Sequence, residues 1–233
     1  MLPIFDSSAV IAPADLAALL PETRAQLTAW AWRYGRRFQD NEDEPTAVEA
    51  PVPTFPYQAL PPSARLRYEL VDWPQLPHYL TLFGADPSPF VDERFKQRAS
   101  LEAYGAALLT ELRYSWKRGA CDWLLRRQSD GQLIGVLHLY ELSHEVIAGR
   151  IAHCCVGYAL VASARREGYG NEALHHLLAQ TARLFGRTEA RALSAAANEA
   201  SEALLRRCGF KVLEDRPLHK YEEATRLWTR ELG

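Results

Sequence analysis

The segment Arg165–Ala173, RREGYGNEA, decides the fold, because two arginines and two glycines lie between a strand pattern and a helix pattern. A helix N-terminus offers unpaired backbone N–H groups and a partial positive charge. Glycine has no Cβ, so Gly168 and Gly170 let the backbone close around a phosphate group. Arg165 and Arg166 add charge that attracts a pyrophosphate. The segment therefore predicts an anion-binding turn that leads into a helix.

The residues around this turn predict regular elements on both sides of it. Apolar residues dominate Ile151–Leu160, which predicts a strand, and apolar residues recur at helical spacing through Asn171–Phe185. Later in the chain the patterns predict a strand at Ala190–Ala195, a helix at Glu199–Arg207, a strand at Lys211–Glu214 and a last strand within Thr225–Arg230. The turn is thus expected inside a strand, helix, strand crossover.

Antiparallel strands are expected before the crossover. Residues Leu66–Leu70 alternate as a strand does, and a helix is expected around Leu101–Tyr114. Two further strands, Trp123–Arg127 and Ile134–Leu142, are joined by a turn of the sequence SDGQ, which predicts a hairpin. A meander that feeds a parallel crossover predicts a mixed α+β class, with a mostly antiparallel mixed sheet flanked by helices.

The first 63 residues differ from the remainder in composition. A helical pattern starts at Pro21, and the stretch Asp40–Ser63 combines acidic residues with six prolines, which predicts a semi-rigid linker. We therefore expect an N-terminal helical extension with a linker over 1–63 and a main domain over 64–233. The helix is expected to pack on its own domain, and a role in docking or dimerisation is the alternative.

Bulk properties narrow the class of partner and the compartment. The formal net charge of -2 provides no global attraction to nucleic acid or to an anionic membrane. No stretch reaches the 18 or so apolar residues that a membrane span needs, and no secretory signal pattern is present. The cysteines lack CxxC spacing, and Cys154 and Cys155 are expected on opposite faces of a strand. A cytoplasmic protein without a metal is predicted.

Gly168 and Gly170 also fit the loose dinucleotide-binding pattern GxGxxG/A, with Glu189 near the spacing of a ribose-binding acid. A dinucleotide fold begins with this unit and repeats strand and helix several times after it. Here antiparallel strands are expected first, and three polar residues precede the glycine turn. The dinucleotide-binding interpretation is therefore the weaker alternative.

Taken as Arg165-x-x-Gly168-x-Gly170, the turn resembles the acetyl-CoA signature of the GNAT superfamily of N-acetyltransferases. The preceding VGYAL (156–160) is similar to the strand that comes before this loop in the family. The later block Asn198-x-x-Ser201-x-x-Leu204, which ends at Gly209-Phe210, is similar to a second family block, most of all in the branch of ribosomal-protein N-terminal acetyltransferases. The resemblance covers roughly residues 65 to 230 and implies a GNAT-like fold with a splayed central strand.

The resemblance implies how acetyl-CoA, as cosubstrate, is held. The implied cofactor-binding residues are the strand residues Ala159, Leu160 and Val161, the turn residues Arg165, Arg166, Gly168, Tyr169, Gly170 and Asn171, and Asn198. In this picture the strand backbone binds the pantetheine arm and the Val161 N–H polarises the thioester carbonyl. The turn amides hold the pyrophosphate.

The resemblance also implies direct transfer of the acetyl group, with catalytic residues that depart from the family pattern. Leu205 occupies the position of a frequent family tyrosine, so Ser201 is the candidate that assists the leaving thiolate, although a serine there is equally a plain helix-start residue. Cys155 occupies the position of a frequent family glutamate. His153 and Glu141 are the other candidates for the base.

The acceptor is expected to be an amine, of a protein N-terminus, a polyamine or an antibiotic. Its specificity is expected to depend on Asp72–Trp116, an ordered but irregular wall with several prolines, and on loop 143–149. Asp86 and Asp92 in that wall are expected to be solvated, with attraction of a cationic acceptor as the alternative. A catalytically silent acyl-CoA-binding module, suggested by the replaced family residues, is the main alternative, and a homodimer is left open.

Overall fold

A computed structural model describes residues 20–23, 25, 60–108, 120–140, 153–185, 187–216 and 225–232. The strands are β1 (Leu66–Leu70), β2 (Cys121–Arg127), β3 (Leu133–Tyr140), β4 (His153–Leu160), β5 (Glu189–Ala195), β6 (Lys211–Arg216) and β7 (Thr225–Glu231). The α-helices are α4 (Pro77–Phe83), α5 (Arg98–Ala106), α6 (Tyr169–Phe185) and α7 (Glu199–Arg207), and short 3-10 helices are η2 (Trp73–Gln75), η3 (Glu93–Phe95) and η6 (Ala162–Ala164).

The described strands form one seven-stranded sheet in the order β1-β2-β3-β4-β5-β7-β6, with β4 in the middle. The β4–β5 pair is parallel, and each of the other neighbouring pairs is antiparallel. This arrangement confirms the predicted mixed α+β class. It excludes the dinucleotide-binding fold, which needs a repeated parallel sheet. Glu189 instead binds the side chains of Arg191 and Thr229.

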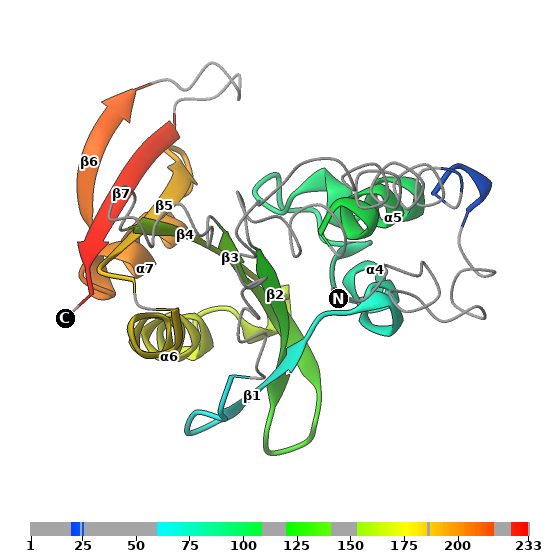
Figure 1. The fold of residues 1–233 in the computed structure, drawn as a ribbon, viewed down its shortest axis with the longest axis horizontal. Coiled ribbons are helices and arrows are strands. Elements are labelled where there is room, and N and C mark those ends of the chain that lie inside the picture. Colours follow the sequence, from blue (N-terminus) through cyan, green and yellow to red (C-terminus); the bar gives the residue numbers. More distant parts are fainter. Residues whose placement is uncertain are drawn as a thin grey trace, which may run out of the picture.

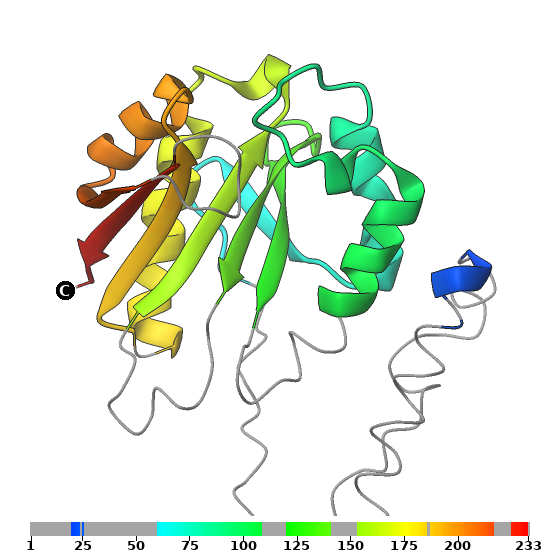
Figure 2. The ribbon, with the colours of Figure 1, turned by 90° about the horizontal axis from the view of Figure 1, so that it is seen from above.

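Helices cover both faces of the sheet. Helices α6 and α7 lie on one face, while α4 and α5 lie on the other (Figures 1 and 2). Alternating residues of β3 serve the two faces, because successive strand side chains point in opposite directions. Leu137 and Leu139 join the core under α6, whereas Val136 joins the core under α4 and α5. We call these two layers the α6 face and the α4/α5 face.

The predicted elements agree with the structure within a few residues at their ends, and the exception is the segment 72–116. The sequence predicts an irregular wall there, but the described part holds η2, α4 and η3, and the helix expected around Leu101–Tyr114 is α5, which starts at Arg98. Pro74 and Pro77 stand in the first turns of η2 and α4, where a missing N–H costs nothing. The prolines therefore start helices instead of preventing them.

Little of the N-terminal region belongs to the described residues. The backbone N–H of Leu20 donates to the carboxylate of Glu102 on α5 at 2.7 Å, just before a helical turn that begins at Pro21. The rest of the predicted N-terminal helix and most of the linker lie outside the described residues, and the proposed division at residue 63 stays a prediction. Among the described helices, none has the length and apolar character needed to cross a bilayer.

Candidate active site

The turn between β4 and α6 has the backbone conformation that the glycines predict. Gly168 has φ 83° and Arg166 has φ 67°, so both residues are in the left-handed region. Glycine adopts this conformation without strain, whereas for arginine it costs about 1 kcal/mol or more. Strain of this kind is typical of functional turns. Alternating backbone conformations turn successive N–H groups toward one point, which favours an anion.

The N-terminus of α6 offers several N–H groups to such an anion. The first intrahelical bond runs from the Glu172 N–H to the Gly168 carbonyl at 3.1 Å. Within the described part of the chain, no hydrogen bond is made by the N–H groups of Tyr169, Gly170 and Asn171. The residues present thus fit a diphosphate, which needs several donors converging from one side.

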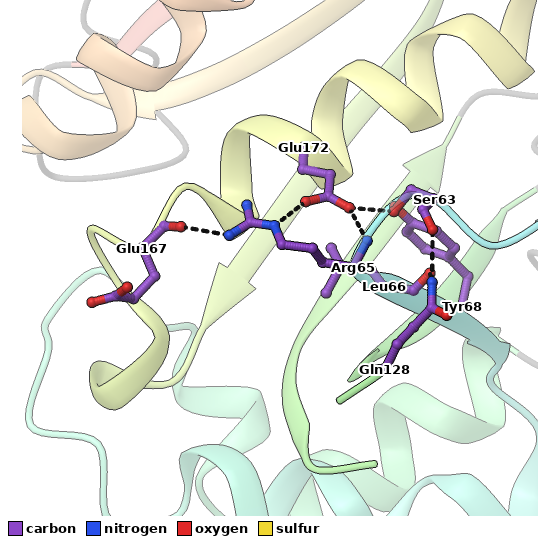
Figure 3. A network of polar contacts seen from close by, with 7 residues as sticks. All are labelled: Ser63, Arg65, Leu66, Tyr68, Gln128, Glu167 and Glu172. Atoms are coloured by element: carbon purple, nitrogen blue, oxygen red, sulfur yellow. Dashed lines mark hydrogen bonds and ion pairs between the residues drawn. The ribbon is translucent and has the colours of Figure 1, made fainter. Parts of the chain in front are cut away.

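A polar network holds this turn against the start of β1 (Figure 3). The Glu172 carboxylate accepts from the Ser63 hydroxyl at 2.8 Å and from the Arg65 backbone N–H and Nε, each at 2.7 Å. The Arg65 guanidinium also donates to the Glu167 carbonyl at 3.1 Å and lies 4.4 Å from the centre of the Tyr169 ring. The turn is therefore fixed before any ligand arrives.

The side chain of Arg165 points to protein partners. Its Nε donates to the Leu160 carbonyl at 2.9 Å, and its guanidinium forms an ion pair with Asp86. The Asp86 side chain is 4% exposed, so the expectation that this carboxylate is solvated is wrong. Asp92 is the more exposed of the two and caps η3 through the N–H of Arg94. Arg165 thus connects the turn to the α4/α5 face.

Strands β4 and β5 separate immediately before the turn. Their parallel pairing ends at Val156 and Ala192, and β4 continues for four residues without β5 beside it. The Val161 N–H donates to the Ile134 carbonyl of β3 at 3.0 Å. Because N–H groups alternate along a strand, Ala159 also faces β3, whereas Tyr158 and Leu160 face the open side. This corrects the expectation that Val161 polarises a thioester carbonyl, since its N–H is already used.

The start of α7 brings the second sequence block to this opening. The Asn198 side-chain oxygen accepts from the Ser201 N–H at 3.1 Å, which is a regular helix cap. The Ser201 hydroxyl lies 2.8 Å from the Tyr158 hydroxyl, and either can donate to the other. Burial, which outweighs the hydrogen bond to Ser201, raises the pKa of Tyr158 to about 12. The phenol therefore keeps its proton at neutral pH.

Of the three predicted base candidates, Cys155 and His153 lie two residues apart on β4. Cys155 is partly exposed and stands opposite Tyr140 on β3, whereas Cys154 is buried on the other side of the strand, as expected. His153 stands at the first residue of β4, where β4 still pairs with β5 at Glu189. Glu141 lies outside the described residues.

Two candidate functional features are not predicted from the sequence. Tyr158 belongs to the β4 strand pattern, where alternation places it on the face opposite Cys155. The other is a buried pair on the α4/α5 face, Asp122 of β2 and His138 of β3, whose atoms Oδ1 and Nδ1 are 2.8 Å apart. A charged residue between Cys121 and Trp123 in a buried strand is a signal that a polar partner is required.

The described residues contain no group of three or more side chains that could hold a metal ion. The candidate site therefore consists of unpaired amides, an opened strand edge, a hydroxyl pair and a buried acid–histidine pair. Such a set can hold an anionic cofactor and move protons beside it.

The comparisons with known proteins identify the family. The family model of the acetyltransferase (GNAT) domain matches residues 66–211, which is more than half of the chain. The chain therefore belongs to the GNAT acetyltransferase family. No curated protein matches its sequence.

Several solved structures share the fold. RimL, a ribosomal L7/L12 alpha-N-protein acetyltransferase in complex with coenzyme A, has a TM-score of 0.61 at 18% identity, over 75% of this chain and 98% of that chain. A GNAT-family acetyltransferase from Bacillus anthracis has a TM-score of 0.58 at 9% identity, over 75% and 98%. The spermidine/spermine N-acetyltransferase SpeG from Vibrio cholerae has a TM-score of 0.54 at 11% identity, over 72% and 94%. At these identities the likeness shows the fold alone.

Proposed function

We propose that this protein transfers the acetyl group of acetyl-CoA to a primary amine, by direct attack within a ternary complex. One observation carries the proposal: the unpaired amides at the start of α6 lie next to the open edge of β4. The amides of Tyr169, Gly170 and Asn171 hold the diphosphate. The amides of Tyr158 and Leu160 then continue along the pantetheine arm as a missing neighbouring strand would.

The hydroxyl pair is assigned to the leaving group. Tyr158 comes from the open part of β4 and Ser201 from α7, so the pair connects the two sides of the opening. Leu205, a buried core residue, occupies the position of a frequent family tyrosine. The hydroxyl of Tyr158 supplies the missing phenol. In the proposed reaction the C–N bond forms, the C–S bond breaks, and the Tyr158–Ser201 pair protonates the departing thiolate. The pair regains this proton from the newly acetylated nitrogen.

The acceptor is proposed to be the N-terminal amine of a protein or a polyamine. RimL acts on a ribosomal protein and SpeG acts on spermidine or spermine, and both share this fold. The second block of this chain, with Asn198 and Ser201, supports the protein N-terminus as the first acceptor to test. An aminoglycoside-like antibiotic is the third class for the acceptor panel.

The test is binding of acetyl-CoA, measured by calorimetry, followed by release of free thiol with a panel of amines. Gly168→Val is expected to weaken acetyl-CoA binding more than about tenfold, or 1.4 kcal/mol, because a side chain distorts the left-handed turn. Gly131→Val is the matched control, since Gly131 is also left-handed at φ 73° but lies in the β2–β3 turn.

Equal affinity of the two variants would contradict the assignment of the turn. Binding by the unaltered protein without thiol release from any amine would favour the silent acyl-CoA-binding module. Thiol release with peptides alone, or with polyamines alone, would decide the acceptor class.

A further inference from the structure

Three residues form a row across the middle of the sheet on the α4/α5 face. Asp122 of β2 is the register partner of His138 of β3, and His138 is the register partner of Gly157 of β4. Facing residues in antiparallel strands share one side of the sheet. The imidazole therefore lies between a carboxylate on one side and a residue without a side chain on the other.

The orientation of the imidazole is fixed. Its Nδ1 lies 2.8 Å from the Asp122 carboxylate, in close contact although not in the alignment of a regular hydrogen bond. The opposite edge faces Gly157, where an added Cβ would lie 3.4 Å from Cδ2 of His138. The ring is stacked on Phe95 at 5.4 Å and on Tyr140 at 5.7 Å. Nε2 is bonded to Cδ2, and among the described residues the polar contact of the ring is the one from Nδ1 to Asp122.

The carboxylate behind this imidazole is held in its charged form. Asp122 is fully buried, and its second oxygen accepts from the hydroxyls of Tyr79 at 2.7 Å and Tyr104 at 2.6 Å. Burial by itself raises the pKa of Asp122, but the positive charge of a protonated His138 and the hydrogen bonds outweigh it and hold the pKa below its ordinary value. A buried carboxylate of this kind stabilises an imidazolium that forms beside it.

The row coincides with the place where the sheet opens. Gly157 is the first residue of β4 after the last β4–β5 pair, Val156 with Ala192. His138 thus lies level with the start of the open edge. His153 is four residues back along the paired part of β4, a separation of roughly 13 Å. Cys155 is intermediate between them.

We propose that His138 is the proton acceptor for the amine substrate and that Asp122 orients it as a positioning residue. This inference rests on the proposed acetyl transfer and deepens it. The substrate ammonium gives one proton to Nε2 of His138, and the resulting amine attacks the thioester carbonyl carbon. The second proton leaves the nitrogen when the amide forms and replaces the one that the Tyr158–Ser201 pair gave to sulfur. His138 then releases its proton to solvent.

Other ionisable groups lie around His138 on the elements packed against it. They are Asp122 on β2, Tyr79 on α4, Tyr104 on α5, Tyr140 on β3, Cys155 on β4, and Asp92 and Arg94 at η3. Burial raises the pKa values of Tyr104 and Tyr140, so these phenols stay neutral. Asp92 and Arg94 neutralise each other at 2.5 Å. The carboxylate of Asp122 is thus the charge in contact with the imidazole.

The experiment is the pH profile of kcat/KM for thiol release with the best amine of the panel. His138→Gln is expected to lower kcat/KM by roughly 10²-fold or more at neutral pH and to remove the acid limb of the profile. Asp122→Asn is expected to keep an acid limb but move it to lower pH, because the imidazolium loses its countercharge. In both variants the Kd for acetyl-CoA is expected to stay within about twofold, since the turn is untouched.

Folding is checked by circular dichroism and by the acetyl-CoA titration itself. If the glutamine variant does not fold, His138→Phe replaces it, because a ring keeps the contacts with Phe95 and Tyr140. His153→Gln is the competing variant. Loss of the acid limb in that variant but not in the His138 variants overturns the inference.

The outcomes separate the two proposals. An unaltered protein that binds acetyl-CoA and acetylates no amine overturns the proposed function, and this inference with it. An active protein whose His138 variants keep the same rate and the same pH profile overturns this inference alone. A lost acid limb with cofactor affinity retained supports the assignment, because a merely structural histidine would not change the profile.

Discussion

The α6 face and the α4/α5 face of the sheet are built by different means. On the α6 face one continuous segment supplies the turn, its left-handed residues and the unpaired amides of the helix start. On the α4/α5 face the polar centre needs side chains from four elements, since Tyr79, Tyr104, Asp122 and His138 come from α4, α5, β2 and β3. The comparison teaches that a cofactor site can be local in sequence while the groups that move protons are assembled at long range.

The two faces also differ in how their charges meet solvent. Arg65, which braces the turn, is 47% exposed, whereas Asp122 is fully buried. Solvent and salt screen the first kind of pair, and a buried pair is screened far less. We therefore expect the loss of one hydrogen bond to cost more stability at the buried centre of the α4/α5 face than at the more exposed α6 face.

The largest effect is expected from removing one hydroxyl on the α6 face. Tyr158→Phe is predicted to lower kcat by roughly 10²-fold, which is about 2.7 kcal/mol of barrier, because the leaving thiolate loses its proton donor. The free energy of unfolding is expected to change by less than about 1 kcal/mol, since Ser201 remains able to bond elsewhere. Thiol-release kinetics and urea unfolding measure the two quantities.

The matched change on the other face is Tyr104→Phe. This variant leaves a buried carboxylate oxygen with one donor fewer, so unfolding is expected to become easier by about 1 to 3 kcal/mol. If both variants lose the same amount of stability, or if Tyr158→Phe leaves kcat unchanged, the proposed division of labour between the faces is wrong.

The turn on the α6 face is predicted almost completely from the sequence, because the residues that form it are neighbours in the chain. Gly168 and Gly170 predict the turn, and strand alternation already separates Cys154 from Cys155. What the sequence misses depends on tertiary contacts. Whether the guanidinium of Arg165 meets a phosphate or Asp86 is decided by a residue 79 positions away.

A motif also does not show which N–H groups of β4 are bonded to β3 and which face the open edge. The motif suggests Val161 as the donor to a thioester, but the register with β3 consumes that N–H and leaves Tyr158 and Leu160 at the open edge. The Asp122–His138 pair is missed for the opposite reason. Each residue stands alone in an apolar strand, and only the β2–β3 register brings the two together.

A medium effect is expected from Glu172, the carboxylate that braces the turn. Burial raises its pKa, but the hydrogen bonds from the Arg65 backbone, the Ser63 hydroxyl and the guanidinium outweigh this and lower the pKa below its ordinary value. A lowered folded pKa means stability that is present above the unfolded value, about 4.3, and is lost as the pH falls through the folded value. Glu172→Gln is predicted to cost about 1 to 2 kcal/mol at pH 7.

The pH series supplies the check on that assignment. The difference in unfolding free energy between the unaltered protein and Glu172→Gln should be constant above about pH 5 and should shrink toward zero at lower pH. Glu167→Gln is the control, because the Glu167 side chain is exposed and only its carbonyl takes part in the network. A difference that persists unchanged at pH 2 would show that the carboxylate charge is not what stabilises the turn.

The smallest effect is expected where the two faces are joined, at the ion pair between Arg165 and Asp86. The pair neutralises a guanidinium that is 38% exposed beside the proposed diphosphate site. Asp86→Asn removes the countercharge, so acetyl-CoA affinity is predicted to rise about two- to threefold, or roughly 0.5 kcal/mol, at low salt and to return toward the unaltered value at high salt. Asp92→Asn is the control, since Asp92 pairs with Arg94 on the α4/α5 face and should leave the affinity unchanged. A fall in affinity for Asp86→Asn would instead mean that the pair holds the turn in shape, and the cofactor site would then depend on the α4/α5 face after all.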